Sequence, residues 1–155
     1  MATFTDALLD GLADELRVHL AEVEADARRI LDAEGINFTF DTANGLYAEA
    51  SRDGRALTVD GEVGSRGRHA RYAHDGRPPG KWPPDKPVRD WLRVKKGVPP
   101  GPELNRATFL VRRKIGRRGT KGSRFLDRAF EARLPDLDAR LARAADRALD
   151  GVSIL

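Results

Sequence analysis

Cysteine is absent from the 155-residue sequence. This absence excludes a disulfide framework and any metal site with thiolate ligands, and it suits a protein that is made in the cytosol. Long apolar runs are absent too, because no stretch approaches the roughly 20 apolar residues that cross a bilayer. Residues 1–10 also lack the basic segment and apolar core of a secretory signal. We therefore expect a soluble protein without a membrane partner.

Groups that perform catalysis are scarce as well. With no thiol, and with no serine in a nucleophile-elbow pattern, the sequence offers no activated nucleophile. The spacing of His19, His69 and His74 is not that of metal ligands. We therefore expect no enzymatic activity, no cofactor and no metal ion. His19 follows the apolar stripe of a predicted helix, so we expect it to be partly buried or to lie at an interface.

Charged residues are abundant and unevenly distributed. Residues 1–64 contain 5 Lys and Arg against 14 Asp and Glu, whereas residues 65–155 contain 23 against 10. The net charge of +4 therefore conceals balances of −9 and +13. Such polarity is informative about partners rather than about the fold. It permits two interpretations: the basic half faces nucleic acid, or the acidic and basic faces of neighbouring copies meet.

The length suits a single domain, 1–155, which we assign to the α+β class. Residues 1–35 are predicted to form a long helix, because apolar residues recur there at gaps of three and four. Thr5 is the expected N-cap of this helix and Gly35 its expected stop. The apolar stripe consists of Leu8, Leu9, Leu12, Leu16, Leu20, Val23, Ala27, Ile30 and Leu31.

Residues 36–74 are predicted to form a small antiparallel sheet of three to four strands. In the first strand, Ile36 to Phe40, apolar and polar residues alternate with a period of two. Two further strands, 46–51 and 56–63, flank an Asp-Gly dipeptide that is typical of hairpin turns. The fourth predicted strand, 68–74, has a weaker pattern.

Residues 75–87 are predicted to be an irregular loop, because five prolines and two glycines interrupt any regular structure there. Residues 88–150 form a helical region with two to four shorter helices. Asp85 is the expected N-cap of the first, which ends at Gly97, and a second ends at Gly119. Pro135 starts a further helix or kinks the last one.

Two glycine motifs resemble known binding loops. Gly76 to Lys81 superficially resembles a phosphate loop, but its spacing is one residue short and its prolines remove the N–H donors that cradle phosphate. We therefore reject nucleotide binding. Gly116 to Gly119 resembles the GXXG loop with which KH domains clamp RNA. This alternative, a nucleic-acid-binding module, stays open, although a Trp-containing helix stands where a KH domain has a strand.

A basic patch surrounds the second motif. No acidic residue interrupts it, so it would bind a phosphate backbone well. The alternatives are a solvated helix face and a contact with the acidic helix of a neighbouring copy. The residues of the patch are Arg112, Arg113, Lys114, Arg117, Arg118 and Lys121. Outside the patch, Trp82 lies between Lys81 and Pro83 and is expected to be an exposed interface anchor.

The segment from Tyr72 to Phe125 combines these parts in a recognisable order: an aromatic strand end, a Gly/Pro loop, a Trp-containing helix, a helix with a basic end and an aromatic entry to the last helix. The residues concerned are Tyr72-Ala73-His74, Gly76–Lys81, Pro83-Pro84, Val88–Leu92, Phe109–Ile115, Arg118–Gly122 and Phe125-Leu126. This order resembles the small virion proteins of tailed phages that complete the tail or join head to tail. Many relatives carry a Gly-x-Leu-Arg-Arg-Ser stretch, of which Gly45-Leu46 remains here, so the subclass is open.

The resemblance implies a structural role in a homo-oligomeric ring, commonly a hexamer, at the neck or tail of the virion. Neighbouring neck and tail proteins would be the partners, DNA would pass through the channel, and the protein would be made in the host cytoplasm. We predict that an oligomer or partner interface involves Tyr72, Arg77, Lys81 and Trp82. The proline-rich loop that holds them is stiff, so docking would cost little ordering entropy.

Overall fold

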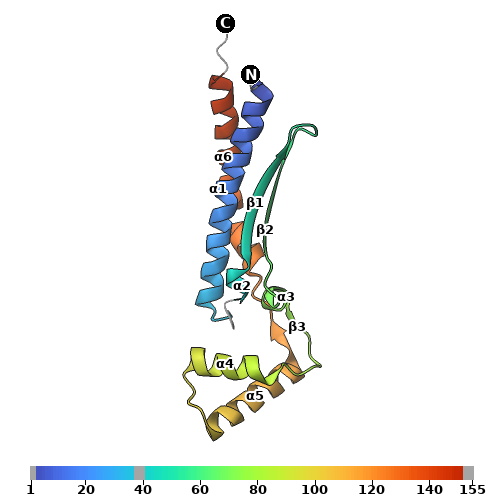
Figure 1. Ribbon diagram of the computed structural model, residues 1–155, viewed down its shortest axis with the longest axis vertical. Helices are drawn as coiled ribbons and strands as arrows, with labels where there is room; N and C mark the ends of the chain where they lie inside the picture. Colours follow the sequence, from blue (N-terminus) through green and yellow to red (C-terminus); the bar gives the residue numbers. More distant parts are fainter. Residues whose placement is uncertain (1–2, 37–40, 152–155) are drawn as a thin grey trace. The chain divides into compact units, whose positions relative to one another are not determined.

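The computed structural model describes residues 3–36 and 41–151, and it confirms the α+β class (Figure 1). The chain divides into two compact units. Unit 1 comprises Met1–Arg28, Leu46–Gly64 and Leu126–Leu155, and unit 2 comprises Arg29–Gly45 and Ser65–Phe125. The elements in chain order are α1 (Phe4–Ala33), α2 (Asp41–Asn44), β1 (Leu46–Asp53), β2 (Thr58–Ser65), α3 (Ala70–Asp75), β3 (Gly76–Arg77), α4 (Asp85–Lys96), α5 (Pro102–Arg118), β4 (Thr120–Lys121) and α6 (Phe125–Asp150).

The long helix predicted at the N-terminus is α1. It begins two residues earlier than expected because Thr3, not Thr5, caps it: the Oγ1 atom of Thr3 accepts the N–H of Asp6 at 3.2 Å. The Asp6 carboxylate accepts the Thr3 N–H in return at 3.1 Å, so two donors at the helix start are satisfied. The predicted apolar stripe is buried at Leu9, Leu20, Val23, Ala27 and Leu31.

In unit 1, α1 lies beside α6 (Figure 1). Arginines on α6 meet carboxylates on α1. Both oxygens of Glu22 accept hydrogen bonds from Arg140 at 2.8 Å, and Arg133 joins Glu22 at 2.7 Å and Asp26 at 2.6 Å. Of the two alternatives predicted for Pro135, the start of a new helix is wrong, because α6 is one helix with Pro135 inside it.

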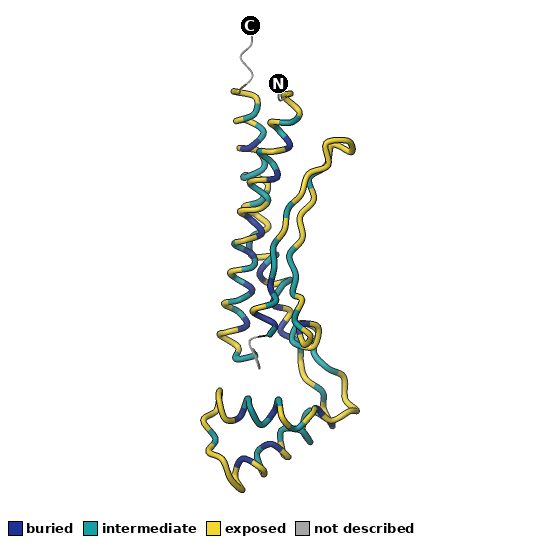
Figure 2. Tube along the Cα trace, in the orientation of Figure 1, coloured by how far each residue is buried: buried dark blue, intermediate teal, exposed yellow. Residues whose placement is uncertain are grey.

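The hairpin β1–β2 also belongs to unit 1 and confirms two of the predicted strands and their turn. Its second strand approaches α1 at Gly61, where a Cβ atom would stand 2.6 Å from Leu20 and 2.7 Å from Leu16. The absence of a side chain at Gly61 thus allows the strand to rest on α1. Towards the turn the hairpin is exposed (Figure 2).

A single sheet of three to four strands is not formed by the described residues. They form two separate strand pairs, β1–β2 and β3–β4, the latter with Gly76 opposite Lys121 and Arg77 opposite Thr120. The strand predicted at 68–74 is wrong, because this segment contains the helix α3. Backbone hydrogen bonds within this segment satisfy its N–H groups: Ala70 donates to the carbonyl of Gly67, and Ala73 donates to the carbonyl of His69. The segment therefore needs no neighbouring strand. The strand predicted at 36–40 lies largely outside the described residues.

Unit 2 is centred on α4 and α5, the two predicted helices with glycine ends. Gly97 ends α4 in the left-handed conformation, φ +65°, as expected of a C-cap glycine. Val88, Leu92 and Leu104 form the buried core between the two helices. The N-cap of α4 is Pro84 rather than Asp85, since Asp85 already lies in the first helical turn and pairs with arginines instead.

Candidate functional site: an aromatic and cationic surface on unit 2

The proline-rich loop before α4 is held against α5 by two polar contacts. The N–H of Gly80 donates to the carbonyl of Gly116 at 2.8 Å, and Nε of Arg112 donates to the carbonyl of Pro83 at 2.8 Å. Since these anchors lie on either side of Trp82 in the sequence, they fix the loop that presents its indole ring. Gly116, buried within α5, provides the flat backbone against which this ring lies.

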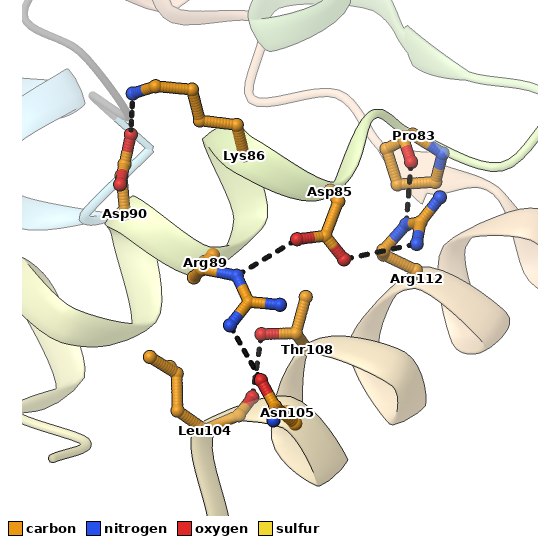
Figure 3. Close-up of polar contacts among 9 residues, drawn as sticks. All are labelled: Pro83, Asp85, Lys86, Arg89, Asp90, Leu104, Asn105, Thr108 and Arg112. Carbon is orange, nitrogen blue, oxygen red and sulfur yellow. Dashed lines mark hydrogen bonds and ion pairs between the residues drawn. The ribbon is translucent and has the colours of Figure 1, made fainter. Parts of the chain in front are cut away.

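Arg112 connects three parts of this arrangement. Besides its bond to Pro83, its guanidinium forms an ion pair with Asp85 at 3.2 Å (Figure 3). The same guanidinium lies 5.9 Å from the centroid of the Trp82 ring, within the range of a cation–π contact. In the same close-up, Arg89 joins Asp85 to Asn105 and thereby ties α4 to α5 (Figure 3). The loop is therefore fixed at the start of α4 as well as along α5.

Trp82 lies next to exposed apolar side chains of α5. Its ring lies 5.7 Å from that of Phe109, and Leu110 follows on the same exposed side of the helix. Trp82 is 43% exposed, Phe109 50% and Leu110 49%. Large side chains that remain this open next to one another are unusual on a folded surface unless the surface binds something.

Cations accompany these apolar side chains on the face of α5 that points away from α4. Arg106, Arg113 and Arg117 lie on this face at helical spacings of three and four from Phe109 and Leu110. None of these three arginines has an ion-pair partner among the described residues. We call the set the aromatic–cationic surface, defined as Trp82, Arg106, Phe109, Leu110, Arg113 and Arg117.

The predicted basic patch is therefore divided by the structure. Arg113 and Arg117 belong to the aromatic–cationic surface, whereas Arg112 turns to the loop and to Asp85. Lys114 and Arg118 are exposed on a flank of α5, and Lys121 is exposed on β4. None of these latter three has an ion-pair partner in the part of the chain that the structure describes.

The alternative of a KH-like loop from Gly116 to Gly119 does not fit the helices and strands of the structure. A KH loop joins two helices, but here residues 116–118 form the last turn of α5, and the strand β4 follows. Gly116 serves a different purpose, since it makes room for the indole of Trp82. Gly119 is the expected C-cap, φ +69°, and its N–H donates to the carbonyl of Ile115.

The four predicted interface residues all lie in unit 2. Tyr72, on α3, is exposed, and the guanidinium of Arg77 lies 5.8 Å from the centroid of its ring. Lys81 is exposed next to Trp82. Trp82 is the member that packs on α5, and it is partly exposed. Sequence reasoning did not select Arg106, Phe109 or Leu110 as interface residues; their spacing outside the buried stripe of α5 was the available signal.

The aromatic–cationic surface combines exposed rings with guanidinium groups. Exposed rings and guanidinium groups suit a partner that offers apolar groups together with negative charge. Among residues 3–36 and 41–151, no group of three or more His, Asp or Glu side chains is placed to hold a metal ion. Within the same residues, no helix is both long and apolar enough to cross a membrane.

Comparisons with models of protein families, with curated proteins and with solved structures found no significant match.

Proposed function

We propose that the protein is a structural assembly component of a tailed phage or phage-like particle, a subunit of the ring that completes the tail or joins head to tail. The observation that carries the proposal is the order of sequence motifs from Tyr72 to Phe125, which resembles that family, although Tyr72 lies on the helix α3 and not at a strand end. These residues fall within unit 2, where the loop, α4, α5 and β4 are tied together by specific contacts. The part of the chain that carries the resemblance also carries the aromatic–cationic surface.

Charge polarity between the two units supports assembly of this kind. Unit 1 contains 9 Lys and Arg against 17 Asp and Glu, whereas unit 2 contains 19 against 7. The units thus carry net charges of −8 and +12. A protomer with two oppositely charged parts favours head-to-tail contacts between copies, and such contacts make a ring when the rotation closes.

Two measurements test this function together. Light scattering on the purified protein, at low and at high salt, is expected to show oligomers that dissociate as salt screens the charges. Co-sedimentation with purified phage tails or head connectors is expected to show binding. A protein that stays monomeric and also fails to bind these particles would contradict the proposal.

A second candidate function, a nucleic-acid-binding module, is favoured by one observation. Trp82 and Phe109 offer ring faces for base stacking beside Arg113 and Arg117, which suit phosphate contacts. This candidate predicts binding of a single-stranded DNA probe that weakens steeply with salt and weakens further when Arg113 and Arg117 are replaced by Gln. Fluorescence anisotropy with no change at low salt would eliminate it.

A further inference from the structure

The turn of the β1–β2 hairpin contains a leucine in an unfavourable position. Leu57 is 61% exposed and adopts φ +55°, in the left-handed region that disfavours side chains other than Gly, Asn and Asp. The rest of the turn is well made, because Oδ1 of Asp53 accepts the N–H groups of Arg55 and Ala56. Neither burial nor backbone preference therefore accounts for a leucine here. Backbone strain of this kind concentrates at functional positions.

The hairpin behind this turn has two different faces. On the face that meets α1, Gly61 approaches Leu16 and Leu20, and Arg52 pairs with Asp10 at 2.8 Å. Since side chains alternate along a strand, the residues on either side of Gly61 and of Arg52 point to the opposite, outer face. Tyr47 and Glu62 meet on that outer face through a hydrogen bond from the tyrosine hydroxyl. The exposed acidic residues that alternation places there are Glu49, Asp60 and Glu62.

The hairpin and the aromatic–cationic surface complement one another in apolar character and in charge. The hairpin presents an apolar tip followed by carboxylates, and the surface presents exposed apolar side chains accompanied by Arg106, Arg113 and Arg117. The two features belong to different units, of net charge −8 and +12. Each copy of the chain therefore carries one element of each kind.

We propose that the β1–β2 hairpin of one copy binds the aromatic–cationic surface of a second copy. Leu57 packs against Trp82, Phe109 and Leu110, and the carboxylates of the outer hairpin face pair with the arginines of α5. This contact rests on the proposed function and specifies the interface through which copies would join. Because each copy gives its hairpin to one neighbour and receives that of another, the contact is heterologous and propagates until a ring closes.

The test uses two complementary variants of the whole chain. Leu57→Asn removes the apolar tip but keeps a residue that tolerates positive φ, so the turn is retained. A double variant, Phe109→Gln with Arg113→Glu, alters the receiving surface and leaves the hairpin intact. Val94→Asn is the matched control, because Val94 is an exposed apolar residue of unit 2 on α4, outside the aromatic–cationic surface. Association is measured by sedimentation velocity up to the highest soluble concentration.

We expect each of the two variants to weaken self-association at least about tenfold, as for loss of a central interface anchor. The control should associate like the unaltered protein. A mixture of the two variants should form mainly a heterodimer, because the intact hairpin of the surface variant can bind the intact surface of the Leu57→Asn variant, whereas every further contact would involve an altered partner. That heterodimer distinguishes a contact between copies from one within a copy.

Several outcomes would overturn the contact. Variants that associate normally would place the interface elsewhere and leave the proposed ring intact. An unaltered protein that is monomeric at every concentration would also overturn it, whereas the proposed function falls only if binding to tails and connectors is absent too. If the surface variant loses binding of single-stranded DNA while its self-association is unchanged, the surface serves nucleic acid instead of the hairpin.

Discussion

The indole ring of Trp82 lies against the backbone of Gly116 so closely that a Cβ atom at position 116 would stand 2.5 Å from its Cδ1 atom. Gly116→Ala should therefore displace the ring. An alanine inside a helix normally stabilises by up to about 1 kcal/mol relative to glycine, but overpacking costs about 1–3 kcal/mol. We expect a net loss of stability in urea unfolding, and a red-shifted Trp82 emission when Trp91→Phe removes the other indole.

Gly11→Ala is the control for this prediction. Gly11 is also helical, but a Cβ atom there meets Ala144 at 4.0 Å, an ordinary van der Waals distance. The same substitution should therefore be neutral or stabilising at Gly11. Equal effects at the two positions would show that the indole does not constrain Gly116.

Arg112 should matter far more to the proline-rich loop than its neighbour Arg113 does. Arg112→Ala removes the hydrogen bond to the Pro83 carbonyl and the ion pair with Asp85. We expect a loss of about 1–2 kcal/mol in the free energy of unfolding and faster proteolysis of the loop. Arg113→Ala should stay within about 0.5 kcal/mol, because it removes no such contact. A similar loss for both variants would contradict the anchoring role of Arg112.

Much of the fold is encoded in local signals, and these were the parts that the sequence predicted. The apolar stripe of α1, the Asp-Gly turn of the hairpin and the glycine ends of α4 and α5 each depend on neighbours within a few residues. The pairing of β3 with β4 could not be predicted in this way, because it joins two-residue strands that are distant in the sequence. The helix α3 could not be predicted either, because its short segment fits the apolar spacing of a helix as well as that of a strand.

The candidate site shows the same division. Sequence reasoning selected Trp82, Arg113 and Arg117 from composition and spacing. It missed Phe109 and Leu110 because their exposure depends on which face of α5 packs against α4. Packing between the two helices determines which face of α5 is buried. Thr108 and Leu104 lie on the buried face, and Leu104 packs in the core with residues of α4.

His19 should make stability depend on pH. Its ring is buried against Phe130, and neither nitrogen has a hydrogen-bond partner among the described residues. Burial lowers the pKa of His19, the Arg140 and Arg133 charges lower it further, and the Glu22 and Asp136 charges oppose them. Because the unfolded chain then takes up the proton more readily, stability is complete above the unfolded pKa, about 6.5, and declines as pH falls below it.

His19→Phe should flatten that decline and keep the aromatic contact with Phe130. Removing an unpaired buried polar group should also raise stability at neutral pH by about 1 kcal/mol or more. Urea unfolding between about pH 5 and pH 8 measures both effects. His69→Gln serves as the control, because His69 is exposed. An unchanged pH dependence in His19→Phe would assign the effect to other groups.

Glu22 should be a major polar contributor between α1 and α6. Glu22→Gln keeps the shape of the side chain but removes the charge that Arg133 and Arg140 share. These side chains are partly buried, so we expect a loss of about 1–3 kcal/mol. Asp14→Asn, at the exposed pair with Arg17, should cost at most about 0.5 kcal/mol. Thermal unfolding at two salt concentrations compares the two, and equal small losses would contradict the prediction.

The two helices of unit 1 lie at opposite ends of the sequence, and this separation affects how the unit forms during synthesis. Its first helix, α1, leaves the ribosome long before α6, which brings Phe130 to His19 and the arginines to Glu22. Until then, the apolar side of α1 lacks the cover of α6 and is open to chaperones and to premature association. A chain interrupted before α6 cannot complete unit 1. Its hairpin, which rests on α1, would then lie on a helix that lacks the cover of α6.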